Sequence, residues 1–208
     1  MGQICITVNR ILIHERVHDD FVDALAAETR AIELGRGLDP GVTYGPVIDE
    51  AVISRVQSHI DDAVKKGATI IVGGDRAMEG DLRNGYFFNP TLIDNASLDS
   101  LPMREETYGP LAALHACGTI NEILSVSNSL RFGLAAYVYS EDLEAAWALA
   151  DRLEFGAVGI NVSDTSELQA PFGGWKLSGF GRELGIEGLK TYLEPKHIKM
   201  RVRRHGSG

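Results

Sequence analysis

A cysteine near the start of the chain is the residue best able to do covalent chemistry. Cys5 closes the run Gly-Gln-Ile-Cys at residues 2–5, and Asn9 and Arg10 follow a short linker. A thiolate is a strong nucleophile, so this position could form a covalent adduct with a substrate. Most free cysteines are instead small buried hydrophobic residues, and the spacing alone favours that interpretation.

Two later segments combine acidic, aromatic and glycine residues in patterns that suit a ligand site. Residues 105–110 read Glu-Glu-Thr-Tyr-Gly-Pro. Taken alone, two adjacent acids before a Tyr-Gly-Pro turn would form a solvated loop. Residues 171–183 read Pro-Phe-Gly-Gly-Trp-Lys-Leu-Ser-Gly-Phe-Gly-Arg-Glu. Their glycines permit positive φ angles, but they lack the spacing and preceding strand of a dinucleotide-binding loop.

Together these segments resemble the catalytic domain of the aldehyde dehydrogenase superfamily. The family has Gly-Gln-x-Cys at its nucleophile, Glu-Glu-x-(Phe/Tyr)-Gly-Pro, and a glycine-rich motif that residues 171–183 match almost position for position. The run Gly-Ala-Val-Gly-Ile-Asn at 156–161 also matches, so the resemblance extends through about Glu194. One position departs from the succinate-semialdehyde branch, which often has a second cysteine where this chain has Thr7.

The resemblance implies a role for each of several residues. Cys5 would add to an aldehyde, giving a thiohemiacetal that is oxidised to a thioester and then hydrolysed to a carboxylic acid. Glu106 would bind the nicotinamide-ribose hydroxyls of NAD or NADP, and Tyr108 would lie beside the nicotinamide ring. Phe172 would line the aldehyde tunnel. We therefore expect the Cys5 sulfur to face a tunnel walled by Tyr108 and Phe172.

The succinate-semialdehyde branch also suggests a substrate. A loop serine of that branch helps to hold the distal carboxylate, and Ser166 occupies the corresponding place in this chain. A loop serine without a ligand is an equally good interpretation. The arginine that completes the anchor precedes the cysteine in that branch, outside these residues.

The resemblance predicts three parts within this chain and places several features of the family upstream of it. We expect a catalytic domain over residues 1–175, a glycine-rich return segment and helix over 176–194, and an oligomerisation strand and tail over 195–208 that would pair with a second copy in a dimer or tetramer. The nucleotide-binding domain, the oxyanion-hole asparagine and the water-activating glutamate of the family lie upstream, so we expect an inactive fragment. A non-catalytic dimerisation module, or a cysteine hydrolase using His14 or His115, remains an alternative.

Composition excludes some classes of partner. The formal net charge of −9 argues against nucleic acid, and no apolar run approaches the length of a membrane span. Two cysteines far apart in sequence fit the reducing cytoplasm. His14 and His18 are four residues apart but lack a third ligand, so the sequence predicts no metal site, and Cys117 is expected to pack inside a strand.

Hydrophobic periodicity predicts strands that alternate with helices. The expected helices span residues 17–34, 49–66, 120–130, 142–153 and 186–192, and the expected strands span 8–14, 68–72, 86–94, 111–117, 134–139, 157–162 and 196–202. This order predicts an α/β fold with an open, mostly parallel sheet and helices on both faces. Pro90 predicts an edge or bulged strand. Helix 142–153 is expected to bury Leu143, Ala146, Trp147 and Ala150.

Overall fold

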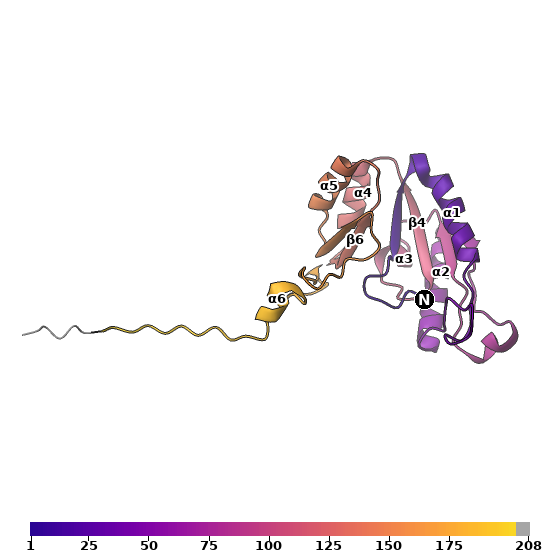
Figure 1. Cartoon of the computed structure of the whole chain (residues 1–208). Helices are drawn as coiled ribbons and strands as arrows, with labels where there is room; N and C mark the ends of the chain where they lie inside the picture. Colours follow the sequence, from indigo (N-terminus) through magenta and orange to yellow (C-terminus); the bar gives the residue numbers. More distant parts are fainter. Residues whose placement is uncertain (203–208) are drawn as a thin grey trace, which may run out of the picture.

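A four-stranded sheet forms the centre of the computed structural model, which describes residues 1–202 (Figure 1). Its strand order is β1 (Arg10–His14), β4 (Leu111–Cys117), β3 (Thr91–Asp94) and β2 (Thr69–Val72). The first three strands are parallel, and β2 runs antiparallel to β3. The sheet is therefore mostly parallel, as the alternating pattern predicts.

Long helices cover both faces of this sheet. Helix α1 (His18–Arg30) buries Val22 and Ala26 against one face, together with Leu92 of β3. Helix α2 (Glu50–Lys65) packs on the other face, where the next residue of the same strand, Ile93, joins the core. Successive side chains of a strand point to opposite faces, so β3 supplies both cores and is buried throughout. These contacts confirm the predicted α/β fold with helices on both faces.

The sequence also sets the ends of α2, the helix that later supports the candidate site. The Asp49 carboxylate accepts a hydrogen bond from the Val52 amide at 3.0 Å, which satisfies one of the free N–H groups of the first turn. Gly67 follows the helix with φ of +97°, a conformation that glycine adopts without steric cost. The predicted helix over 49–66 is confirmed to within one residue at each end.

A second, smaller unit packs beside the main sheet. Parallel strands β6 (Ala135–Val138) and β7 (Ala157–Ile160) carry helices α4 (Ile120–Asn128) and α5 (Leu143–Arg152), with a separate core around Leu124, Val138, Ala146 and Leu153. Within residues 1–202 these strands do not pair with the main sheet, so the expected single sheet is divided. Arg10 of β1 joins the two units by donating to the Val126 and Ser127 carbonyls at the end of α4.

Short elements complete the chain. Strands β5 (Phe132–Gly133) and β8 (Trp175–Lys176) form an antiparallel pair. The short helices are η1 (Glu15–Val17), η2 (Gly80–Asn84), α3 (Leu101–Arg104) and α6 (Gly185–Lys190).

Two expectations about packing are wrong. Strand β3 is an inner strand, not an edge, because Pro90 lies just before it and its missing N–H falls outside the ladder; the irregularity in pairing lies in β2, between Ile70 and Val72. On α5, Leu143 and Trp147 are 65% and 71% exposed. The two-stranded sheet beneath α5 is narrow and is covered by a single row of side chains, from Ala146 to Leu149 and Leu153.

The C-terminal segment leaves the body of the molecule after α6 (Figure 1). The strand expected over 196–202 is not formed within the described chain, and the last part of the expected tail, 203–208, lies outside the described residues. Between residues 1 and 202, no helix is long and apolar enough to cross a membrane.

Candidate active site around Cys5

Cys5 lies at the tip of a tight turn. The Thr7 amide donates to the Ile4 carbonyl at 3.0 Å and closes the turn over residues 4–7. The Tyr137 hydroxyl, from β6, donates to the Ile6 carbonyl at 3.0 Å and holds the turn against the smaller unit. The thiol of Cys5 is exposed, whereas that of Cys117 is buried. Of the two thiols, only the one at the turn can be reached by a dissolved carbonyl compound.

The residues before the turn lie directly on the segment that carries Tyr108. Gly2 has φ of +72°, and a Cβ atom there would overlap the carbonyl oxygen of Gly109. The Gln3 side-chain oxygen accepts from the Ile48 amide at 3.0 Å. Only glycine permits both the left-handed backbone and this close approach, so the Gly-Gln pair before the cysteine has a local structural reason.

Asn9 joins the chain after Cys5 to the segment of Glu106 and Tyr108. Its side-chain amide donates to the carbonyls of Pro102 at 2.8 Å and Glu105 at 3.0 Å. Its oxygen accepts from the Thr107 amide at 2.9 Å. One side chain therefore fixes both ends of the backbone that presents Glu106.

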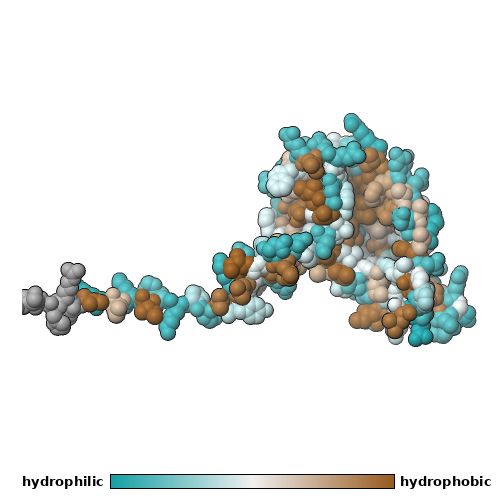
Figure 2. Space-filling view, viewed as in Figure 1, coloured by the Kyte–Doolittle hydropathy of each residue, from teal (hydrophilic) through white to brown (hydrophobic). Residues whose placement is uncertain are grey.

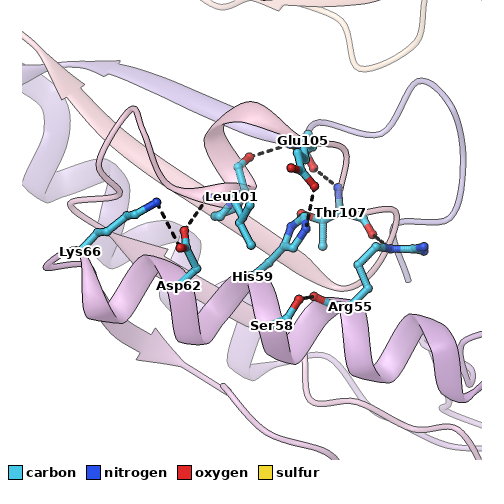
Figure 3. A network of polar contacts seen from close by, with 10 residues as sticks. Arg55, Ser58, His59, Asp62, Lys66, Leu101, Glu105 and Thr107 are labelled. Atoms are coloured by element: carbon cyan, nitrogen blue, oxygen red, sulfur yellow. Dashed lines mark hydrogen bonds and ion pairs between the residues drawn. The ribbon is translucent and has the colours of Figure 1, made fainter.

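Helix α2 holds the same segment from the other side (Figure 3). Arg55 donates from Nε to the Thr107 carbonyl at 2.8 Å, and His59 Nδ1 lies 3.0 Å from the Thr107 hydroxyl. His59 and Thr107 are only 2% and 1% exposed. Burial lowers the pKa of His59, although Glu105 lies 3.9 Å from its Nε2 and opposes this shift. We call Asn9, Arg55, His59 and Thr107 the clamp.

The clamp places Glu106 and Tyr108 beside the Cys5 turn. A small hollow brings together two residues of the turn, Ile4 and Thr7, with Glu106 and Tyr108. Tyr108 has φ of +51°, which is unfavourable for a bulky residue and is maintained by the bonds to its neighbour Thr107. The Cys5 turn and the segment of Glu106 and Tyr108 therefore lie side by side, but Cys5 itself lines neither this hollow nor the larger one described next, so its approach to Tyr108 stays a prediction.

A larger depression lies on the other side of the turn. It has a volume of about 270 Å³ and is mostly apolar, with Tyr137, Tyr139 and Ser163 facing the residues of the turn. Burial raises the pKa of Tyr137, so its hydroxyl stays protonated and can donate to the turn. Sequence analysis missed these residues, although alternate tyrosines in a predicted strand are a signal of a shared face.

Phe172 and Ser166 are not brought to this place. Phe172 is half-buried and forms two backbone hydrogen bonds with Glu183, at 2.8 and 2.7 Å. Ser166 is exposed, and its amide donates to the Asp164 carboxylate at 2.8 Å. Neither residue lines a hollow beside the Cys5 turn, so the tunnel wall expected from Phe172 is not formed there. Its role, and that of Ser166, stays a prediction.

Comparison with known proteins decides the family. The model described as "Aldehyde dehydrogenase family" matches residues 1–198. The chain belongs to the aldehyde dehydrogenase family. It is 41% identical over 198 residues to mitochondrial succinate-semialdehyde dehydrogenase of Rattus norvegicus, a match that covers 95% of this chain and 37% of the relative. It is also 41% identical over 197 residues to succinate-semialdehyde dehydrogenase [NADP(+)] of Escherichia coli K12, covering 95% of this chain and 40% of that one.

Solved structures of aldehyde dehydrogenases have the same fold as this chain. Betaine aldehyde dehydrogenase of Staphylococcus aureus in complex with NAD+ superimposes with a TM-score of 0.91 at 38% identity, over 99% of this chain and 42% of that structure. Succinate-semialdehyde dehydrogenase of Burkholderia pseudomallei gives a TM-score of 0.87 at 44% identity, over 92% and 39%. The chain thus spans about 40% of the length of the proteins it matches.

Proposed function

We propose that this chain supplies the nucleophilic thiol and one edge of the cofactor site of an NAD(P)-dependent aldehyde dehydrogenase. The observation that carries the proposal is the exposed Cys5 turn, which shares a hollow with Glu106 and Tyr108 in a chain of this family. Cys5 lies about a hundred positions before Glu106 and Tyr108, and Asn9, four residues after Cys5, bonds to the segment that carries them.

The residues present fit one edge of a nicotinamide dinucleotide. Glu106 is an exposed carboxylate that can accept from two vicinal ribose hydroxyls, and Tyr108 offers a partly exposed ring beside it. Gly2 and Gly109 add no side chains to this surface. The hollow is too small to enclose a dinucleotide, so these residues would hold the nicotinamide end only. When bound, NAD or NADP would supply the hydride acceptor.

The Cys5 turn suits covalent chemistry on an aldehyde. The thiolate sulfur would form a bond to the carbonyl carbon, and the carbonyl oxygen would take up the negative charge. The backbone N–H of Cys5 is a candidate donor to that oxygen. Loss of hydride from this adduct leaves a thioester on Cys5, and water then releases the carboxylic acid. Glu106 is the one carboxylate among the residues that line the two hollows, and it is assigned to the ribose hydroxyls. A second carboxylate that could activate water is not among these lining residues, so we expect negligible turnover from the 208-residue chain.

We propose an aldehyde with a distal acidic group as the substrate. Relatives at 40–42% identity are named for succinate semialdehyde, glutarate semialdehyde and 3-sulfolactaldehyde. Ser166 would donate to the distal anion. Asp164 accepts from the Ser166 amide, so a carboxylate lies next to the proposed anchor and would repel the distal anion. A cationic group must therefore complete the anchor.

Competition for the thiol tests this proposal. Iodoacetamide alkylation of Cys5, followed by peptide mass spectrometry, should slow when succinate semialdehyde occupies the sulfur as a thiohemiacetal. Succinate, which lacks the aldehyde, should leave the rate unchanged, and glutathione treated in parallel gives the protection expected of any thiol. Protection of Cys5 no greater than that of glutathione would overturn the proposal.

We propose the cytoplasm as the location of the protein. The proposed protein partner is a second copy of the chain. Residues of α6 and the segment after it expose large side chains: Ile186, Leu189, Tyr192, Leu193, Ile198 and Met200. Figure 2 shows brown, hydrophobic surface at intervals along this part of the chain. Several exposed apolar side chains in one segment are typical of an interface. Sedimentation equilibrium should show a dimer or larger assembly that dissociates in the double variant Ile198→Lys, Met200→Lys.

A further inference from the structure

Three side chains of metal-binding type meet where β4 ends. His115 and Cys117 alternate along β4 and share one face, and Glu122 arrives from the first turn of α4. One ligand atom from each lies within 4.8 Å of the other two. We infer that His115, Cys117 and Glu122, called the β4–α4 cluster, bind a divalent zinc-type cation.

The histidine and the glutamate are oriented by the backbone in the way that metal ligands usually are. His115 Nδ1 lies 2.9 Å from the Ala96 carbonyl oxygen. A carbonyl can only accept, so Nδ1 carries the proton and Nε2 keeps a lone pair. Glu122 accepts from the Gly118 amide at 2.8 Å, which fixes one carboxylate oxygen and leaves the other available. Such outer contacts set the tautomer and direction of a ligand before the ion binds.

The charge around the cluster also favours a cation. The carboxylates of Glu15 and Glu122 flank Gly118, at 3.6 and 3.7 Å from the position that its Cβ would take. Neither carboxylate forms an ion pair with a basic side chain within residues 1–202. The Cys117 thiol is 1% exposed. A divalent ion would displace the thiol proton to solvent and balance the charges of thiolate and carboxylate.

The donor set identifies the class of ion. Zinc accepts one nitrogen, one sulfur and one carboxylate oxygen in a tetrahedral arrangement, whereas magnesium and calcium prefer oxygen alone. Ligand atoms of a tetrahedral zinc site lie about 3.5 Å apart, so the three ligand atoms, which lie within 4.8 Å of one another, would draw closer as the ion binds. Glu15 or water would take the fourth position.

The site is distinct from the proposed active site. None of its three residues lines a hollow beside the Cys5 turn. A bound ion would fasten the Gly118 turn between β4 and α4 and stabilise the contact of the two units. This inference replaces the sequence expectation of no metal, because the third ligand becomes visible only when the chain turns back at Gly118.

Zinc competition with a chromophoric chelator tests the inference, using the full chain with Cys5→Ser so that the exposed thiol cannot contribute. We expect one zinc ion per chain and a loss of affinity of about 10-fold or more in Glu122→Gln and in Cys117→Ser. Glu144→Gln, on the exposed face of α5, is the matched control and should bind as the parent does. Cobalt(II) should show thiolate-to-metal charge-transfer absorption in the parent but not in Cys117→Ser.

Unchanged zinc affinity in Glu122→Gln would overturn the inference, as would zinc binding that disappears with Cys5→Ser. Because Glu122 is exposed, this variant should keep its fold, and circular dichroism checks that it does. If Cys117→Ser fails to fold, Glu122→Gln and His115→Gln decide the outcome.

Discussion

The two sides of the Cys5 turn are held by different means. On one side, the segment with Glu106 and Tyr108 is fixed by the side chains of Asn9, Arg55 and His59, which come from two other elements. On the other side lies Ser163, the first residue of loop 163–185; around Ser166 and Phe172 the bonds stay within this loop, as from Gly185 to Leu168, whereas β8 in the same loop pairs with β5. The segment proposed to bind the cofactor is therefore held by side chains from elsewhere in the chain, and the residues proposed to bind the substrate are not.

This difference assigns different consequences to mutations on the two sides. Buried polar groups that lose a partner cost free energy, because nothing replaces the lost hydrogen bond. Thr107 and His59 are buried, whereas Ser166 is exposed to water that can replace its partners. Variants of the clamp should therefore change stability, and variants of the loop should change only ligand contacts.

Asn9→Ala should have the largest effect. It removes three hydrogen bonds and leaves the Thr107 amide and two carbonyls without this partner, so we expect a loss of about 3 kcal/mol in the free energy of unfolding. Urea unfolding measures the change. Asn121→Ala, at an exposed position of α4, is the matched control and should stay within about 0.5 kcal/mol of the parent. Equal stability of the two variants would show that the clamp contributes nothing.

Thr107→Val sharpens the comparison by removing only one oxygen. The shape of the side chain is kept, but His59 Nδ1 loses its partner inside the protein. We expect a loss of about 1–2 kcal/mol by urea unfolding. Thr69→Val, at an exposed position of β2, makes the same chemical change without burial. A loss as large in Thr69→Val would mean that the effect does not arise from the clamp.

His59 and His18 should contribute to the pH dependence of folding stability with opposite signs. Burial lowers the folded-state pKa of His59, so its contribution to stability is present above about pH 6.5 and is lost as the pH falls below it. Asp19 and then Asp94 raise the pKa of His18 by hydrogen bonding, so its contribution is present below about pH 6.5 and is lost as the pH rises through the raised folded pKa.

Urea midpoints from about pH 5 to about pH 8 separate the two histidines. Relative to the parent, His59→Gln should lose less stability on acidification, and His18→Gln should lose more. The same slope in both variants and in the parent would contradict these assignments.

Ser166→Ala should have the smallest effect on stability, within about 0.5 kcal/mol, because its side chain is exposed. It should weaken the protection of Cys5 by succinate semialdehyde while leaving protection by propanal, which lacks the distal acid, unchanged. A loss of more than about 1 kcal/mol in urea would show that loop 163–185 is held as firmly as the clamp.

The sequence predicts the periodic elements well and the contacts between them poorly. Asp49 and Gly67 mark the ends of α2 through local backbone chemistry, and the motif of residues 105–110 locates the segment that lies beside Cys5. The clamp was missed because Asn9 and His59 are ordinary residues in isolation, and only tertiary packing brings them to Thr107. The inner position of β3 was missed because Pro90 stops short of the ladder.

The central claim is that Cys5 is the nucleophile of this chain. An activated ester such as p-nitrophenyl acetate tests it without cofactor, because the thiolate attacks the carbonyl and nitrophenolate leaves. We expect a burst of about one nitrophenolate per chain, which is abolished in Cys5→Ala, and an acetyl group that peptide mass spectrometry maps to Cys5. A burst that persists in Cys5→Ala, or an acetyl group found on Cys117 or on lysine instead, would contradict it.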